Sequence, residues 1–249
     1  PTATAPRYRA FISYSQKDQE FSNWLHRSLE IYRVPRRLVG RETRDGPVPP
    51  RLYPVFRDRE ELPTNADLGA NLEGALRASR YLVVVCSPRA AQSRWVNEEV
   101  RAFKAMGRED RVLAVILDGE PNASDRPDGA VLECFPPAIR HRVGEDGRLT
   151  DARCEPIAAD ARPGKDAKRA VLLKVVAGLI GVGFAELFDR DARRRRRRRV
   201  AAAALGVLVV ALVAATWLVG ERSKARAVDW QLAVARDGRA KRFLEADDE

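Results

Sequence analysis

The sequence predicts an α/β fold, in which helices cover both faces of a parallel sheet, followed by a helix that spans a membrane. Three observations predict it. Short apolar runs alternate with helical patterns along the first half of the chain. One of these runs, Tyr81–Cys86, is apolar throughout and rich in valine, as is typical of a strand buried on both faces. Farther along, Val200–Val219 holds twenty residues without a charge.

The expected strands are short, apolar and bounded by turn residues: Ala10–Tyr14, Tyr53–Phe56, Tyr81–Cys86 and Val112–Leu117, with Pro156–Ala158 as a weak fifth. Apolar residues at helical spacing predict helices between and after them: Phe21–Tyr32, Asp67–Ser79, a helix that Ser93 caps, and Lys165–Phe188, with a short one around Pro137–Arg142. Strands that alternate with helices in this way form parallel sheets.

Polar residues at two places in the sequence are positioned to begin helices. Ser15 and Asp18 have the spacing of a capping box, and Ser93 precedes a helical pattern. In that last helix Trp95 and Glu99 are four residues apart, so they share one face. Both follow the buried strand Tyr81–Cys86 closely. We therefore expect a carboxylate beside an aromatic ring at the carboxyl edge of the sheet, where open α/β sheets bind ligands.

Composition excludes several classes of function. The net charge is +10, but seven positive charges lie in Arg193–Arg199, and the rest of the chain carries only +3. Nothing outside that block resembles a nucleic-acid surface. Three cysteines at irregular spacing suit neither a disulfide framework nor a zinc site, which favours a reducing compartment. Two isolated histidines argue against a metal site, so no metal is expected.

The uncharged stretch Val200–Val219 has the length needed to cross a bilayer, with Trp217 near one end and Arg193–Arg199 at the other. The excess of arginine before the stretch predicts a single-pass protein of the cell (inner) membrane whose N-terminal domain is cytoplasmic. We expect the arginines of this block to contact anionic lipid. The alternatives are a buried alanine-rich helix for the stretch and a nucleic-acid or nuclear-import patch for the block. The tail 220–249 is charged, and we expect it to be helical.

Several of these segments, in this order and spacing, resemble the Toll/interleukin-1 receptor (TIR) domain family in its bacterial branch. They are Phe11–Ser15 with Asp18, Phe56-Arg57-Asp58 through Leu62-Pro63, the Ser87-Pro88 stop, and Trp95-x-x-x-Glu99. The resemblance implies a flavodoxin-like sheet over residues 1–188. It is best over 8–117 and thin over 118–188, before the arginine-rich segment 189–199. The chain departs from the family at Pro63-Thr64, where Pro-Gly is common, and at Ser15-Gln16, where some enzymatic members have arginines.

The resemblance implies that the chain cleaves NAD at the nicotinamide–ribose bond in signalling or defence, with NAD as substrate and no further cofactor. It assigns catalysis to Glu99 and maps NAD contacts onto Tyr14, Ser15, Asp58, Leu62 and Trp95. It also implies that a loop holding Leu62, Pro63 and Thr64 meets a neighbouring TIR domain, so that the chain assembles as a homo-oligomer on activation.

One carboxylate can serve this reaction. Glycosidases usually need a second one to protonate the leaving oxygen, but nicotinamide leaves from a nitrogen that is already cationic. A carboxylate near the ribose then acts by stabilising the positive charge that develops at C1′. Glu99 is placed for that role.

Each assignment has a plainer alternative. Glu99 can be a solvated residue that complements the helix dipole, Trp95 a core residue, and Asp58 a residue that only holds its loop. For the whole chain the alternative is a non-enzymatic TIR scaffold that signals by TIR–TIR contact. A receiver-type phosphorylation domain is excluded, because Ser13-Tyr14-Ser15 and Cys86-Ser87 stand where that class needs acidic residues.

Overall fold

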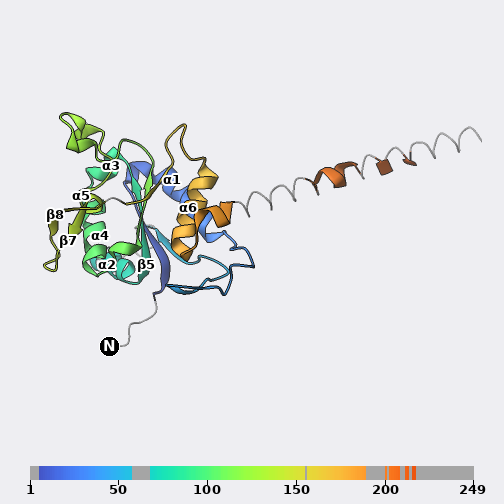
Figure 1. Ribbon diagram of the computed structural model, residues 1–249, viewed down its shortest axis with the longest axis horizontal. Coiled ribbons are helices and arrows are strands. Elements are labelled where there is room, and N and C mark those ends of the chain that lie inside the picture. Colours follow the sequence, from blue (N-terminus) through green and yellow to red (C-terminus); the bar gives the residue numbers. More distant parts are fainter. Residues whose placement is uncertain are drawn as a thin grey trace, which may run out of the picture. The chain divides into compact units, whose positions relative to one another are not determined.

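The computed structural model describes residues 6–57, 68–154 and 156–188, and farther along 200, 202–207, 211–212 and 215–216. The chain divides into two units, Pro1–Asp189 and Arg190–Glu249. The first unit holds a central sheet between two layers of helices (Figure 1).

Five parallel strands form this sheet. Their order in space is β4 (Val55–Arg57), β1 (Tyr8–Ser13), β5 (Ser79–Cys86), β6 (Val112–Ile116) and β9 (Ala158–Asp160). All four pairings between neighbours are parallel. When these five strands are numbered in the order in which they occur in the sequence, their order in the sheet is 2-1-3-4-5, as in flavodoxin-like folds. The predicted α/β class is therefore confirmed.

Helices cover both faces of the sheet. On one face lie α1 (Gln19–Glu30) and α6 (Lys168–Ile180); on the other lie α2 (Leu68–Arg77), α3 (Pro88–Ala91), α4 (Arg94–Ala105) and α5 (Pro137–Arg140) (Figure 1). Strand β5 supplies both cores, because Tyr81, Val83 and Val85 join the first cluster and Leu82, Val84 and Cys86 the second. This double burial explains why its sequence is a continuous apolar run and does not alternate.

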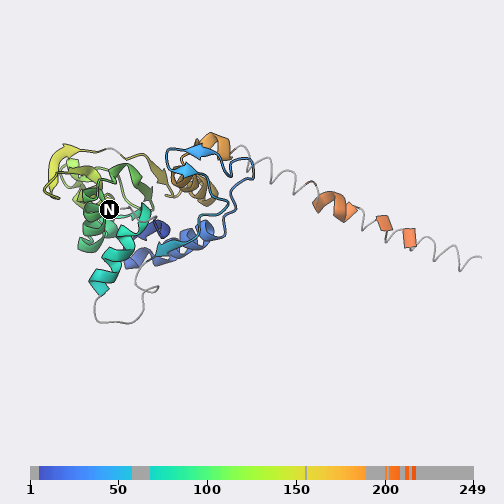
Figure 2. The same ribbon diagram turned by 90° about the horizontal axis from the view of Figure 1, so that it is seen from below.

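The long connections contain small hairpins that the sequence analysis did not predict. Strands β2 (Glu42–Thr43) and β3 (Gly46–Pro47) pair in the expected loop Arg33–Arg51. This hairpin lies beside the end of α6 (Figure 2), and Arg41 Nη1 forms an ion pair with Glu186 at 3.0 Å.

A second hairpin and several short 3-10 helices fill the remaining connections. Strands β7 (His141–Val143) and β8 (Leu149–Arg153) follow α5. Among the described residues, the 3-10 helices are η1 (Gln16–Asp18), η3 (Glu109–Arg111), η4 (Ala123–Asp125) and η5 (Gly129–Val131).

Two local predictions are wrong. The helix expected over Lys165–Phe188 is interrupted, because Gly181 adopts a left-handed conformation (φ 67°) and its amide closes the last turn of α6, as glycine often does at a helix end. Helical backbone resumes at 184–188. The capping box also fails, since neither Ser15 nor Asp18 makes a side-chain capping bond. The weak fifth strand exists, two residues later than expected, as β9.

The predicted membrane-spanning helix is contradicted, and with it the single-pass location in the cell (inner) membrane. Among the described residues no helix is long and apolar enough to cross a bilayer. The longest described helix, α6, has 13 residues, whereas a span needs about twenty. Within Val200–Val219 the structure describes 200, 202–207, 211–212 and 215–216. Arg193–Arg199, expected to contact lipid, Trp217 and the tail 220–249 lie outside the described residues.

Candidate active site at the carboxyl edge of the sheet

The direction in which successive strands are added to the sheet reverses between β1 and β5. The chain passes from β1 to β4 on one side of β1, and then crosses to β5 on its other side. Ligands of open α/β sheets bind outside the carboxyl ends of the strands at this change of direction. Ser13 ends β1 and Cys86 ends β5, so the residues that follow them line this edge.

Helix α4 brings a carboxylate to this edge. Its start is fixed by Ser93, whose Oγ accepts a hydrogen bond from the Val96 amide at 3.4 Å, as the sequence predicts. Its buried face packs Val96, Val100 and Phe103 into the core beneath the sheet. Glu99 lies next to that face and is only partly exposed.

Glu99 is held by the end of β1. Ser13, which is 1% exposed, donates a hydrogen bond from its Oγ to Glu99 Oε2 at 2.5 Å. Glu98 differs from its neighbour in both respects: it is exposed and forms an ion pair with Arg101 on the same helix. The Arg101 guanidinium lowers the pKa of the Glu98 carboxyl. The two adjacent glutamates therefore face different surroundings, and only Glu99 points its carboxylate to the sheet edge.

The other residues that the resemblance mapped onto the site have different outcomes. Tyr14 and Ser15 follow β1 directly and are half-buried, and Tyr14 packs against the core cluster of α1 and α6. Trp95 lies one turn before Glu99 on α4 and is 62% exposed, so its interpretation as a core residue is wrong. The candidate residues Asp58, Leu62, Pro63 and Thr64 lie outside the described residues.

Asp18 is a structural residue of this edge whose role the sequence analysis missed. It is 3% exposed and accepts hydrogen bonds from Ser87 Oγ (2.5 Å) and Arg89 Nε (2.8 Å). The Ser87 hydroxyl in turn accepts from the Ala90 amide and caps α3. Arg89 also pairs with Asp118 at 3.3 Å. These contacts join the segments that follow β1, β5 and β6, so they fix the edge on which Glu99 lies.

The cysteines do not supply a nucleophile. Burial raises the pKa of Cys86 far above its usual value, and burial with the nearby Glu133 raises that of Cys134 to about 12. Burial and the hydrogen bond to Glu109 raise the pKa of Cys154. All three are unbridged thiols, and a protonated thiol is a poor nucleophile. In the part of the chain that the structure describes, no group of His, Cys, Asp and Glu side chains suits a metal ion.

Comparison with known proteins agrees with the fold. Residues 50–140 match the family described as TIR domain. This part of the chain is similar to a TIR domain. The chain is 34% identical, over 196 residues, to the NAD(+) hydrolase ApTIR of Actinoplanes sp., an alignment that covers 76% of this chain and 25% of the relative. The chain thus spans about a quarter of that relative's length. These findings confirm the predicted resemblance to TIR proteins of the bacterial type.

Among solved structures, the chain is similar to the TIR domains in the structure of the activated Roq1 resistosome directly recognizing the pathogen effector XopQ. The identity is 23% and the TM-score is 0.36, and the match covers 49% of this chain and 66% of the other.

Proposed function

We propose that this TIR domain cleaves NAD at the nicotinamide–ribose bond, with Glu99 as the catalytic residue and NAD as substrate. The observation that carries the proposal is the Glu99 carboxylate, which Ser13 holds at the carboxyl edge of the sheet where the strand order reverses. Similarity to an NAD(+) hydrolase over 196 residues supports the choice of substrate.

Cleavage of the nicotinamide–ribose bond requires one well-placed carboxylate from the protein. The glycosidic C–N bond breaks, its electron pair goes to the pyridinium nitrogen, and neutral nicotinamide leaves. Positive charge develops on C1′ and the ring oxygen, and the Glu99 carboxylate stabilises it. Water then adds to C1′ and releases a proton, which gives ADP-ribose. Because the leaving nitrogen is already cationic, no second carboxylate is needed as a general acid, unlike in most glycosidases.

Ser13 contributes by holding the carboxylate in place. A preorganised group does not have to reorient as charge develops, and this is the main source of electrostatic catalysis. The exposed indole of Trp95, one turn before Glu99, offers an aromatic surface for a ring of the dinucleotide. Tyr14 and Ser15 supply the rim that follows β1. We assign Asp58 and Leu62, which follow β4 in the sequence, as further contacts with NAD.

We further propose that activity depends on assembly. The segment with Leu62, Pro63 and Thr64 contacts a second copy of the chain and completes the pocket, so the active species is a homo-oligomer that acts in signalling or defence. A sequence segment that combines charged residues with a proline and a leucine is typical of a contact surface.

The direct test incubates the purified full chain with NAD and measures nicotinamide release by chromatography, with and without a fused domain that forces clustering. We expect release, and more of it in the clustered protein. A chain that binds its own copies but releases no nicotinamide under either condition is a TIR scaffold, and the enzymatic proposal then fails.

A further inference from the structure

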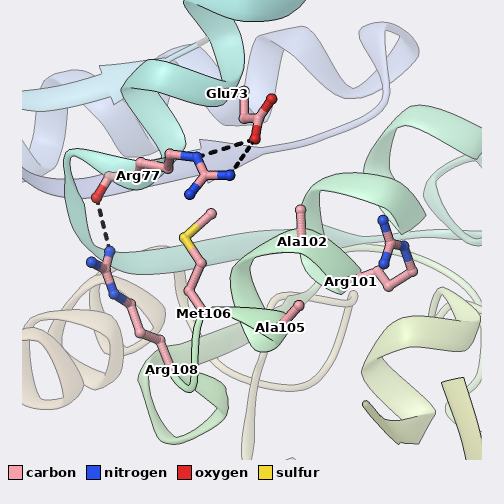
Figure 3. A pocket seen from close by; sticks show the side chains of 7 residues that line it. All are labelled: Glu73, Arg77, Arg101, Ala102, Ala105, Met106 and Arg108. Atoms are coloured by element: carbon pink, nitrogen blue, oxygen red, sulfur yellow. Dashed lines mark hydrogen bonds and ion pairs between the residues drawn. The ribbon is translucent and has the colours of Figure 1, made fainter. Parts of the chain in front are cut away.

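A pocket lies on the outer surface of α2 and α4, and neither Ser13 nor Glu99 lines it. It has a volume of about 520 Å³ and is lined by Glu73, Arg77, Arg101, Ala102, Ala105, Met106 and Arg108 (Figure 3). Glu99 belongs to the first half of α4, whereas Ala102, Ala105 and Met106 belong to its last turns and its end. The pocket therefore faces the opposite edge of the sheet from the candidate active site.

Three arginines from three segments meet at this pocket, and each is held by part of its guanidinium group. Arg77 Nε donates to Glu73 at 3.1 Å on α2. Arg108, in the turn after α4, donates from Nη1 to the carbonyls of Arg77 and Ser79, both at 2.9 Å. Arg101 is held by Glu98 and by the Gly147 carbonyl. The guanidinium groups are thus positioned before any ligand arrives.

Two of these arginines have N–H groups that remain available to donate hydrogen bonds to a ligand. Within the described residues, Nη1 of Arg77 and Nη2 of Arg108 donate no hydrogen bond. Glu73 is the only carboxylate among the seven lining residues, against three guanidinium groups. Burial and the like charges of Arg111 and Arg77 lower the pKa of Arg108, as expected where positive charge exceeds negative charge. An anion with several oxygens, such as a phosphate, matches these forked donors.

The floor of the pocket is apolar. Ala102 and Ala105 leave space above α4, and the Met106 side chain extends from the end of the helix towards the Arg77 guanidinium (Figure 3). A polarizable thioether packs well against the face or edge of a flat aromatic ring. The volume also lies in the range of small-molecule sites. An inorganic phosphate alone would leave this floor uncovered.

From these features we propose that the pocket between α2 and α4 binds a nucleoside phosphate. Its phosphate accepts from Arg77 and Arg108, and its base lies on Met106 beside Ala102 and Ala105. Because α4 also carries Glu99, a ligand here stabilises the helix that bears the carboxylate. The proposal does not depend on NAD cleavage, since the pocket is formed by other residues at the other edge.

The test uses the full chain with ADP as probe. Binding is measured by calorimetry and the site is located by photolabelling with 8-azido-ADP, followed by trypsin digestion and mass spectrometry. We expect the label on the peptides that span Ala102–Arg108. Arg77→Gln removes one phosphate contact and should raise the Kd for ADP about tenfold, the usual worth of a charge-assisted hydrogen bond. Ala105→Glu, which adds a negative charge to the floor, should weaken binding at least as much.

Two controls separate this pocket from other nucleotide sites. Arg37→Gln removes an exposed arginine from the connection before β2 and should leave the Kd unchanged. Glu99→Gln should leave the labelling of Ala102–Arg108 unchanged, even if it abolishes nicotinamide release. Adenosine and inorganic phosphate should each bind at least tenfold more weakly than ADP. Label confined to other peptides, or a Kd that Arg77→Gln and Ala105→Glu do not change, overturns the proposal.

Discussion

Ser13 at the end of β1 and Glu99 on α4 lie 86 positions apart in the sequence and are joined by a hydrogen bond from Ser13 Oγ to Glu99 Oε2. The serine is fully buried and belongs to the sheet, whereas the glutamate is partly exposed and belongs to a helix packed on it. The bond therefore fixes the position of a partly exposed carboxylate relative to the sheet.

The two adjacent glutamates of α4 provide the sharpest test of the catalytic assignment. Glu99→Gln keeps the size of the side chain and removes its charge, so we expect nicotinamide release to fall by about two to three orders of magnitude, as when other groups that stabilise transition-state charge are removed. Glu98→Gln removes a charge that only pairs with Arg101, and activity should stay within about twofold. Equal losses in the two variants would show that Glu99 has no special role.

Ser13→Ala tests whether the carboxylate must be held. The variant loses one hydrogen bond, which corresponds to about 1 kcal/mol of transition-state stabilisation, and we expect kcat to fall roughly fivefold with little change in KM. The matched control is Ser22→Ala on α1, because Ser22 is equally buried and its hydroxyl has no hydrogen-bond partner among the described residues. If both variants lose kcat alike, the effect comes from packing and not from orientation.

Asp18→Asn tests the contacts that hold the strand exits together. The change keeps the shape but removes the negative charge of the buried Asp18 carboxylate, which pairs with Arg89 Nη2 at 2.7 Å. We expect the free energy of unfolding to fall by about 1.5–3 kcal/mol, measured by urea denaturation. Asp118→Asn breaks the other, more exposed ion pair of Arg89 and should cost less than about 1 kcal/mol.

The surroundings of Asp45 predict that the free energy of unfolding decreases in acid. It lies between β2 and β3, is 5% exposed, accepts from the Tyr81 hydroxyl and pairs with Arg111 at 3.1 Å. Burial alone would raise its pKa, but Tyr81, Arg111 and other nearby arginines outweigh it and the pKa is lowered from 3.8. A lowered pKa gives stability that is present above pH 3.8 and is lost as the pH falls through the folded-state value.

The measurement is the free energy of unfolding between pH 7 and pH 2, for the wild type and for Asp45→Asn. The wild type should lose stability steeply below about pH 4, and the variant should lose less, because it lacks this titrating group. Parallel pH profiles for the two proteins would show that Asp45 carries no such contribution.

The assembly proposal predicts activity that rises more than linearly with protein concentration. Leu62→Asp and Pro63→His should reduce activity at high concentration by blocking contact between copies, while circular dichroism shows an unchanged fold. When the wild-type protein is tethered to a surface, it should be active even at low bulk concentration, because tethering raises the effective concentration of neighbouring copies. Activity strictly proportional to concentration down to dilute monomer would mean that each copy has a complete site.

Local patterns in the sequence were enough to predict the sheet and its helices. A strand such as Tyr81–Cys86 is recognisable because burial on both faces requires apolar residues at every position, and the start of α4 because Ser93 caps it. The same local reasoning failed at Gly181, where one left-handed residue ends α6 inside a continuous helical pattern. It also failed at Val200–Val219, where hydropathy and flanking arginines predicted a membrane span that the described residues do not contain.

The sequence by itself determined which residue types stand near the carboxyl ends of the strands, because strand ends and helix starts are local features. Only the tertiary structure decided which of them meet. Ser15 and Asp18 have the spacing of a helix cap, yet Asp18 binds Ser87 and Arg89 instead, and the hydrogen bond between Ser13 and Glu99 has no local signal at all. Such contacts depend on strand order and on the rotation of a helix about its axis, which packing of the whole core sets and no short stretch of sequence contains.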